Sequence, residues 1–184
     1  MTGGTRVSEE ALTEEVAQRL IELSRDWEAE NSCHGYRANT MDDLAGRRVF
    51  LARDGAGEIV GYLFGIAATQ EKETSVIHRG ARKFEVEELY VRPERRCMGV
   101  GRALFGCMEE AVRNDADCIF LSTATKDARR VLHFYLDELG MEFWSASLVK
   151  HLEQKDTGGE KRFLPAAYDD ATGTEKRTDF GETL

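Results

Sequence analysis

Residues 84–102 read FEVEELYVRPERRCMGVGR, an apolar strand that ends at Pro93 and leads into a turn with two glycines. The next residues carry an apolar stripe at three- and four-residue spacing, made by Ala103, Leu104, Cys107, Met108, Ala111 and Val112, which predicts a helix. The first turn of a helix leaves backbone N–H groups unpaired, and the helix dipole adds partial positive charge there. This order of strand, glycine turn and helix predicts an anion site that suits phosphate oxygens.

The strand before the turn does not keep a period of two. Its apolar residues fall at even positions first and at odd positions later: Phe84 and Val86, then Leu89 and Val91. A regular strand cannot hold all four on one face. One extra residue near Glu87 and Glu88 would restore the register, which predicts a β-bulge that leaves backbone groups unpaired for a ligand.

These residues resemble the acyl-CoA-binding motif of the GNAT superfamily of N-acetyltransferases. The resemblance rests on residues 86–93, on the Arg-x-x-Gly-x-Gly pattern at 96–101, and on the downstream segment LHFYLDELGM at 132–141. The downstream segment is similar to the Phe-Tyr and Leu-Gly-Phe pattern near the end of this family's domain, and the likeness extends over residues 10–152. The P-loop and Rossmann glycine patterns are absent, so neither ATP nor NAD is favoured.

The resemblance implies an α/β fold of the GNAT type. We expect a mixed, mostly antiparallel sheet of about six strands flanked by helices, with the bulged strand at its centre followed by a pyrophosphate-binding turn and helix. The composition agrees, because 184 residues with 41% hydrophobic and 32% charged side chains suffice for one sizeable core. No apolar run has the length of a membrane span.

The remaining elements follow from periodicity and capping residues. We expect a helix over residues 9–29 capped by Ser8, and a short helix opened by Thr40. Strands are expected at 49–53 and 59–67, joined as a hairpin, and at 118–123. A helix over 127–139 should end at Gly140, and residues 141–152 read as a last strand.

The family usually has two strands where this chain offers one continuous run at 141–152. A seventh strand is therefore missing, or it is supplied by the tail or by the second subunit of a homodimer. We expect the acetyltransferase domain to span residues 1–152. Residues 153–184 are expected to form a polar tail that is flexible or supplies the strand.

The resemblance implies acetyl-CoA as the cosubstrate. The backbone amides of Leu89 and Val91 would bind the pantetheine arm and the thioester oxygen. The pyrophosphate would rest on the amides of the turn, whose contributing residues are Arg96, Cys97, Gly99, Val100, Gly101 and Arg102. Family members often carry an Asn seven residues before their tyrosine, and Ala128 stands there in this chain, which removes one amide contact.

Direct transfer of an acetyl group requires a neutral amine, a polarised carbonyl and a proton for the leaving thiolate. Tyr135 matches the tyrosine that family members use as a general acid toward the coenzyme A sulfur, and a phenol with a pKa of about 10 stays protonated at neutral pH. Three carboxylates crowd the central strand, Glu85, Glu87 and Glu88. Glu87 is the first choice of base, since the segment also resembles spermidine/spermine acetyltransferases, and Glu88 is the second. A water chain without a dedicated base is the alternative.

Charge and cysteine usage limit the partners. A net charge of -9 disfavours nucleic acid and leaves cationic amines open, so the expected acceptor is a small-molecule or peptide amine shaped by the loops 31–39 and 69–82. Four cysteines without ligand spacing predict reduced thiols and no metal. The first residues lack the basic start and apolar middle of a signal peptide, which predicts a cytoplasmic protein without membrane attachment. A catalytically silent acyl-CoA-binding module is the competing function class.

Overall fold

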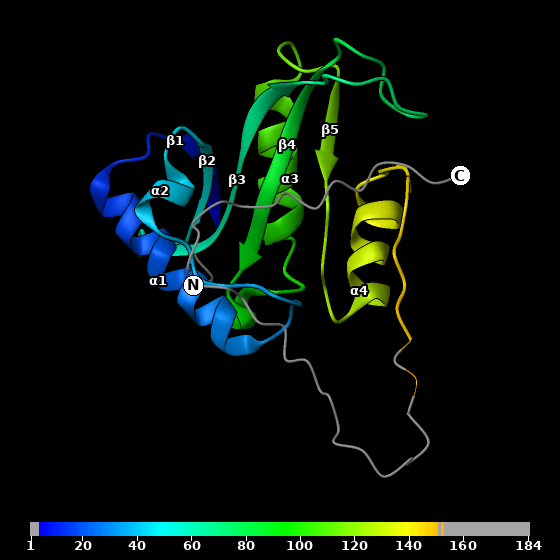
Figure 1. The fold of residues 1–184 in the computed structure, drawn as a ribbon. Helices are drawn as coiled ribbons and strands as arrows, with labels where there is room; N and C mark the ends of the chain where they lie inside the picture. Colours follow the sequence, from blue (N-terminus) through cyan, green and yellow to red (C-terminus); the bar gives the residue numbers. More distant parts are fainter. Residues whose placement is uncertain (1–3, 151, 153–184) are drawn as a thin grey trace. The chain divides into compact units, whose positions relative to one another are not determined.

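A five-stranded sheet forms the framework of the computed structural model, which describes residues 4–150 and 152 (Figure 1). The strands are β1 (Arg6–Glu10), β2 (Arg48–Arg53), β3 (Ile59–Thr69), β4 (Arg82–Val91) and β5 (Cys118–Leu121). They lie side by side in chain order, antiparallel from β1 to β4 and parallel between β4 and β5. The mixed, mostly antiparallel α/β fold is confirmed, with five strands in the described residues where about six were expected.

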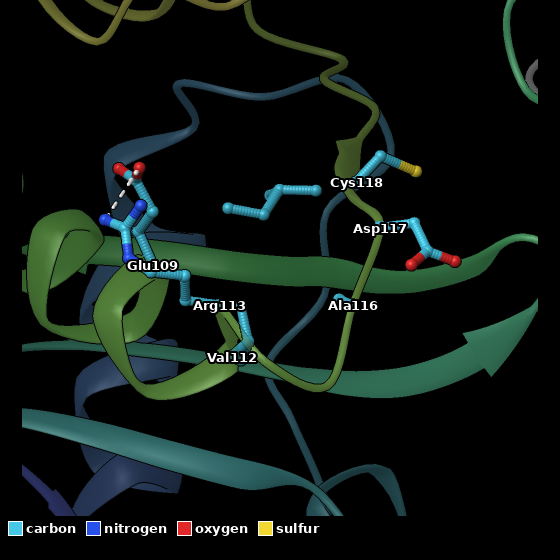
Figure 2. Close-up of a pocket in the computed structure, with 7 residues that line it drawn as sticks. Glu109, Val112, Arg113, Ala116, Asp117 and Cys118 are labelled. Carbon is cyan, nitrogen blue, oxygen red and sulfur yellow. Dashed lines mark ion pairs between the residues drawn. The ribbon is translucent and has the colours of Figure 1, made fainter.

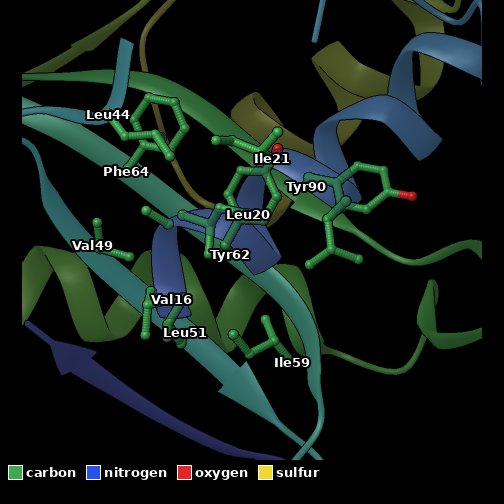
Figure 3. Packing of buried hydrophobic residues seen from close by; sticks show 12 residues of the cluster. Val16, Leu20, Ile21, Leu44, Val49, Leu51, Ile59, Tyr62, Phe64 and Tyr90 are labelled. Carbon is green, nitrogen blue, oxygen red and sulfur yellow. The ribbon is translucent and has the colours of Figure 1, made fainter. Parts of the chain in front are cut away.

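Helices cover the two faces of this sheet (Figure 1). On one face, α1 (Glu14–Glu30) and α2 (Met41–Leu44) bury a cluster that includes Leu20, Leu51 and Tyr62 (Figure 3). On the other face, α3 (Val100–Val112) packs against a second cluster that includes Phe50 and Leu63. The alternation of neighbouring residues such as Phe50 and Leu51 between the two clusters is the period of two of a strand buried on both sides.

The predicted bulge lies at Glu87. Phe64 of β3 pairs with Glu88 and the next residue, Gly65, pairs with Val86, so Glu87 has no partner in the ladder. The extra residue returns all four apolar side chains of β4 to the α3 side of the sheet. A side chain at Gly65 would not fit, because a Cβ atom there would lie 2.3 Å from the carbonyl oxygen of Glu85.

The helix predicted over residues 9–29 is wrong at its start. The chain first forms β1, with Ser8 inside the strand, and α1 begins at Glu14 with Thr13 as its N-cap, whose hydroxyl accepts a hydrogen bond from the Val16 N–H at 3.2 Å. Strand β1 lacks apolar alternation in its sequence. It is held to β2 by the antiparallel ladder and by ion pairs of Arg48 with Glu9 and of Arg53 with Glu10. The second cap was predicted correctly, since Thr40 and Asp43 form a capping box at α2.

The strand predicted at 141–152 is also absent from the described residues. Helix α4 (Ala128–Leu132) continues into a π-helical segment, η2 (His133–Glu138), and Gly140 follows with φ at 70°. Residues 141–150 and 152 carry neither helix nor strand. The residue types of a segment give it strand propensity but do not provide a pairing partner. Among the described strands β5 pairs only with β4, so residues 141–150 have not paired with it.

Contacts divide the chain into a unit that ends at Ser145 and a second unit from Ala146. Of the second unit the structure describes residues 146–150 and 152, whose side chains are exposed. The predicted tail, 153–184, lies outside the described residues, so the domain boundary at 152 stays a prediction. None of the described helices combines the length and the hydropathy that a bilayer crossing requires.

Candidate active site

The segment from Arg96 to Arg102, called here the glycine turn, joins the short 3-10 helix η1 (Pro93–Arg95) to α3. Two of its residues have left-handed backbone conformations, Cys97 with φ at 59° and Gly99 with φ at 80°. Such residues in a turn direct successive N–H groups into one concavity, a backbone nest that favours anions. Gly99 is the N-cap of α3, and because glycine has no side chain, the N-cap residue offers no side-chain acceptor to the first-turn N–H groups.

The two glycines of the turn serve different purposes. A Cβ atom at Gly99 would meet nothing within 4 Å, so this position needs glycine for its positive φ. At Gly101 a Cβ atom would lie 3.3 Å from the ring of Phe134 in η2. Gly101 therefore allows η2 to approach the start of α3 closely.

Beyond the bulge, one edge of β4 has no strand beside it among the described residues. The pairing between β4 and β5 ends at Val86 and Leu121, whereas β4 continues to Val91 (Figure 1). The N–H of Arg92 donates to the carbonyl of Val60 in β3 at 3.0 Å. Because N–H groups alternate along a strand, those of Leu89 and Val91 point to the other edge, beyond the end of β5. These are the two amides predicted to bind the pantetheine arm.

Glu88 is a partly buried carboxylate of β4. Its Oε2 atom accepts hydrogen bonds from Tyr62 Oη at 2.8 Å, Asn39 Nδ2 at 2.9 Å and Tyr36 Oη at 3.3 Å, whereas its Oε1 atom takes part in none of the three. Burial raises the pKa of Glu88 to about 7, although the three hydrogen bonds act to lower it. Glu88 and its three donors, Tyr36, Asn39 and Tyr62, are called here the Glu88 cluster.

The neighbouring carboxylates of β4 are in ion pairs. Glu87, the bulged residue, accepts from Arg47 Nε at 2.7 Å and from Arg47 Nη2 at 3.0 Å, and both side chains are 27% exposed. Glu85 pairs with Lys83 at 3.2 Å. An ion pair with arginine stabilises the charged form of a carboxylate. Hydrogen bonds from neutral groups in a buried site stabilise the charged form less. Glu88 therefore differs from its neighbours in being a buried acid without a charged partner among its three donors.

Tyr135 lies half-buried in η2, and its ring packs against Phe105 and Phe134, with centroids 6.5 and 5.2 Å away. Burial, together with a smaller contribution from Cys33, raises the pKa of Tyr135 to about 12. Burial also raises the pKa of Cys33, to which the charge of Glu88 adds. Cys33 is thus close enough to both Glu88 and Tyr135 for electrostatic interaction with each.

The loop after α1 is joined to the loop after β5. Cys33 forms a β-bridge with Thr125, and the N–H of His34 donates to the carbonyl of Ala124 at 2.8 Å. The N–H of Lys126 donates to Ser32 at 2.9 Å. These bonds connect the segment that carries Tyr36 and Asn39 with the segment that leads to Tyr135.

Sequence reasoning marked Glu87, Glu88 and Tyr135 but missed the three donors of the Glu88 cluster. Tyr62 reads as an ordinary core residue of an apolar strand, and Tyr36 and Asn39 lie in a stretch that its composition marks only as a loop. The one available signal for such donors was Glu88 itself, a carboxylate directly before the apolar run from Leu89 to Val91.

Two surface hollows lie away from these residues. One, of about 210 Å³, lies where α3 ends and β5 begins (Figure 2). Its lining includes the ion pair of Glu109 and Arg113 together with Val112 and Cys118. The other, of about 520 Å³, lies between α1 and the β2–β3 hairpin. Neither is lined by a predicted catalytic residue, so size alone does not locate the chemistry.

Comparisons with known proteins identify a family and a shared fold. Residues 12–141 match the family described as the acetyltransferase (GNAT) family. No curated protein matches the chain. Among solved structures, a mutant protein from Bacillus halodurans is similar, with a TM-score of 0.61, 19% identity, and coverage of 80% of this chain and 99% of that one.

Two further structures carry names that state an activity. An aminoglycoside acetyltransferase from an uncultured soil metagenomic sample has a TM-score of 0.57 at 18% identity, covering 81% of this chain and 97% of that chain. A ribosomal-protein-alanine N-acetyltransferase from Brucella melitensis has a TM-score of 0.54 at 15% identity, covering 80% of this chain and 100% of that chain. At these identities the likeness shows a shared fold.

Proposed function

The chain belongs to the GNAT acetyltransferase family and is an acetyltransferase, and we propose that it transfers an acetyl group from acetyl-CoA directly to a primary amine in a ternary complex. The observation that carries this proposal is the Glu88 cluster, in which three neutral donors hold one oxygen of a carboxylate beside the open edge of β4. Burial raises the pKa of this carboxyl to about 7. A base whose pKa lies near the working pH combines a useful deprotonated fraction with useful basicity.

The glycine turn and the open edge of β4 would hold acetyl-CoA. Amides in the left-handed turn at Cys97 and Gly99, together with the first N–H groups of α3, suit a pyrophosphate. The amides of Leu89 and Val91, which point away from β3, suit the pantetheine arm and the thioester oxygen. The coenzyme would then lie along the edge where β5 has ended.

The chemical step would use Glu88 and Tyr135. The Oε1 atom of Glu88, which none of the three donors occupies, removes one proton from the acceptor ammonium. The neutral nitrogen attacks the thioester carbonyl carbon, the C–S bond breaks, and the departing thiolate takes the proton of the Tyr135 hydroxyl. The attacking nitrogen then gives up its extra proton, which restores the Tyr135 hydroxyl and leaves a neutral amide, while Glu88 releases its proton to solvent. A raised pKa of about 12 keeps that hydroxyl protonated until the thiolate forms. We therefore favour Glu88 over Glu87, whose two oxygens accept from Arg47.

The acceptor class stays broad. Structural neighbours are named for an aminoglycoside and for a ribosomal protein, so the fold alone does not choose between a small molecule and a peptide. The acidic composition, with a net charge of -9, favours a cationic acceptor. We also infer a cytoplasmic location, supported by four free thiols, and a strand-exchanging homodimer stays a prediction.

A free-thiol release assay with acetyl-CoA and a panel of amines tests the proposal. We expect thiol release with at least one amine, a strong loss in Glu88→Gln, and near-normal release in Glu85→Gln, which removes a neighbouring charge. A loss confined to Glu87→Gln would instead make Glu87 the base. Binding of acetyl-CoA without thiol release for any amine would favour the silent acyl-CoA-binding module.

A further inference from the structure

Arg96, the first residue of the glycine turn, has its side chain hydrogen-bonded to other groups of the protein. Its Nε donates to the carbonyl oxygen of Val91 at 2.8 Å, and its Nη2 donates to both carboxylate oxygens of Glu30, each at 2.8 Å. Glu30 is the last residue of α1 and also accepts from Tyr90 Oη at 2.9 Å. The guanidinium carbon lies 5.6 Å from the centroid of the Tyr90 ring. A guanidinium engaged in this way faces the protein rather than the anion site.

The first of these bonds holds the turn to the open edge of β4. The carbonyl of Val91 points to the same edge as the Val91 N–H, because both groups of a strand residue share one side. In the part of the chain that the structure describes, this edge has no strand partner beyond Val86. Arg96 therefore donates a hydrogen bond to the Val91 carbonyl at this edge. This bond holds the start of the turn beside the amides that would bind the pantetheine arm of the coenzyme.

The second bond holds the turn to the end of α1. Asn31, the C-cap of α1, has a left-handed φ of 51°, and the loop that carries Tyr36 and Asn39 starts there. Both Glu30 and Arg96 are only partly exposed, at 21% and 27%. Charge-assisted hydrogen bonds shielded in this way are stronger than surface ion pairs.

Aromatic contacts continue from Glu30 to Glu88. The ring centroids of Tyr90 and Trp27 are 5.5 Å apart, and those of Trp27 and Tyr36 are 4.3 Å apart. The Tyr36 hydroxyl donates to Glu88. Trp27 Nε1 also donates to Ser32 Oγ at 3.0 Å. The glycine turn and the Glu88 cluster are thus linked by continuous contacts through the end of α1.

We propose that the Arg96 side chain is a positioning group that acts through Glu30, and that it places the glycine turn and the loop of Tyr36 relative to each other instead of binding the coenzyme. This inference rests on the proposed function, because it presumes that the turn binds acetyl-CoA. The backbone N–H of Arg96 donates to the carbonyl oxygen of Pro93 at 3.3 Å, so the anion site would rest on the amides of the later residues of the turn. Two sites linked in this way should be energetically coupled.

The test is a double-mutant cycle on coenzyme A affinity, measured by calorimetry at a temperature where each ligand-free variant is folded. Arg96→Gln and Glu30→Gln should each weaken binding by about tenfold, and the double variant should be no weaker than the weaker single variant. Glu28→Gln, which removes a charge from the exposed side of the same helix turn, is the matched control and should bind as the wild type does.

A second measurement separates positioning from general loss of stability. In Glu30→Gln the KM for acetyl-CoA should rise, and the rising limb of the pH profile of kcat/KM should move, since the loop that supplies Tyr36 starts beside Glu30. Arg96→Lys keeps the positive charge but loses the planar guanidinium that donates to two partners at once, so it should show both effects in weaker form.

Other results would overturn the inference. If Arg96 binds phosphate directly, Glu30→Gln frees the guanidinium, so affinity stays or improves while Arg96→Gln alone loses it. Losses that multiply in the double variant would mean independent roles. If wild-type protein binds no coenzyme A at all, the proposed function fails and this inference fails with it. If wild-type protein binds but the cycle shows no coupling, only this inference fails.

Discussion

The glycine turn and the Glu88 cluster are built in opposite ways. The turn is a continuous segment that presents backbone N–H groups, with left-handed residues and the positive end of α3 providing the field. The Glu88 cluster is made of side chains from β4, β3 and the loop after α1, whose hydroxyl and amide groups hold one carboxylate oxygen inside the core. The turn suits the pyrophosphate of the coenzyme. The Glu88 cluster sets the pKa of a single proton-transfer group.

The two regions should therefore respond differently to substitution. A side chain placed in the turn should disturb binding without touching the base, since the turn holds its ligand by backbone shape. A change in the Glu88 cluster should act mainly on pH dependence, since its ligand is a proton, whereas a change at the Arg96–Glu30 pair that links the two regions should affect both. The predictions below test this separation, from the largest expected effect to the smallest.

Gly99→Asp should cause the largest loss. The substitution places a side chain at a φ of 80° and a negative charge in the anion site. Saturating acetyl-CoA, which at a hundredfold excess over its Kd would stabilise the wild type by about 2.7 kcal/mol, should no longer shift the melting temperature. Gly106→Asp, at an exposed position of α3 with open space around it, is the matched control and should keep the shift. A full shift in Gly99→Asp would remove the glycine turn from coenzyme binding.

Glu88→Gln should lower kcat/KM by about 10² to 10⁴ at neutral pH, the usual contribution of a general base. The deficit should shrink as the pH approaches the pKa of the acceptor amine, because the amine is then already neutral. Coenzyme affinity should stay near the wild-type value. A pH-independent deficit would indicate a structural role for Glu88 in place of proton transfer.

Tyr135→Phe should lower turnover by about 10², toward the smaller end of the range for general acids because water can partly replace the phenol. The ring and its packing against Phe105 remain, so affinity for acetyl-CoA should be preserved. Acetyl donors with better leaving groups need less protonation and should restore turnover in the variant. Normal turnover with acetyl-CoA would exclude Tyr135 as the acid.

The contrast between the two regions also explains what the sequence could predict. The turn, the bulge at Glu87 and helix α3 could be found because each depends on neighbouring residues: a phase shift, two glycines and one apolar stripe. The donors of Glu88 lie 26, 49 and 52 positions away along the chain, and only the folded sheet brings Tyr62, Asn39 and Tyr36 to it. The same limit applies to β1 and to residues 141–150, since pairing with a second strand decides whether a segment is a strand.

Tyr62→Phe should give the smallest effect and the most specific one. The variant keeps the ring but removes the shortest of the three hydrogen bonds to Glu88. That bond lowers the pKa of Glu88, so its loss should raise the pKa by about one unit. Because the base acts when deprotonated, the rising limb of the pH profile should move to higher pH, with little change in the plateau. A shift to lower pH would contradict the arrangement of donors.

The central claim is that Glu88 is a buried carboxyl group that titrates near neutral pH. The most direct measurement is the carboxyl carbon chemical shift of glutamates labelled with carbon-13, followed by NMR from pH 3 to 9 and assigned by comparison with Glu88→Gln. One resonance, missing from the variant, should titrate with a pKa of about 7. A Glu88 resonance that titrates near 4.5, the ordinary value, would contradict the account and return the base to Glu87 or to water.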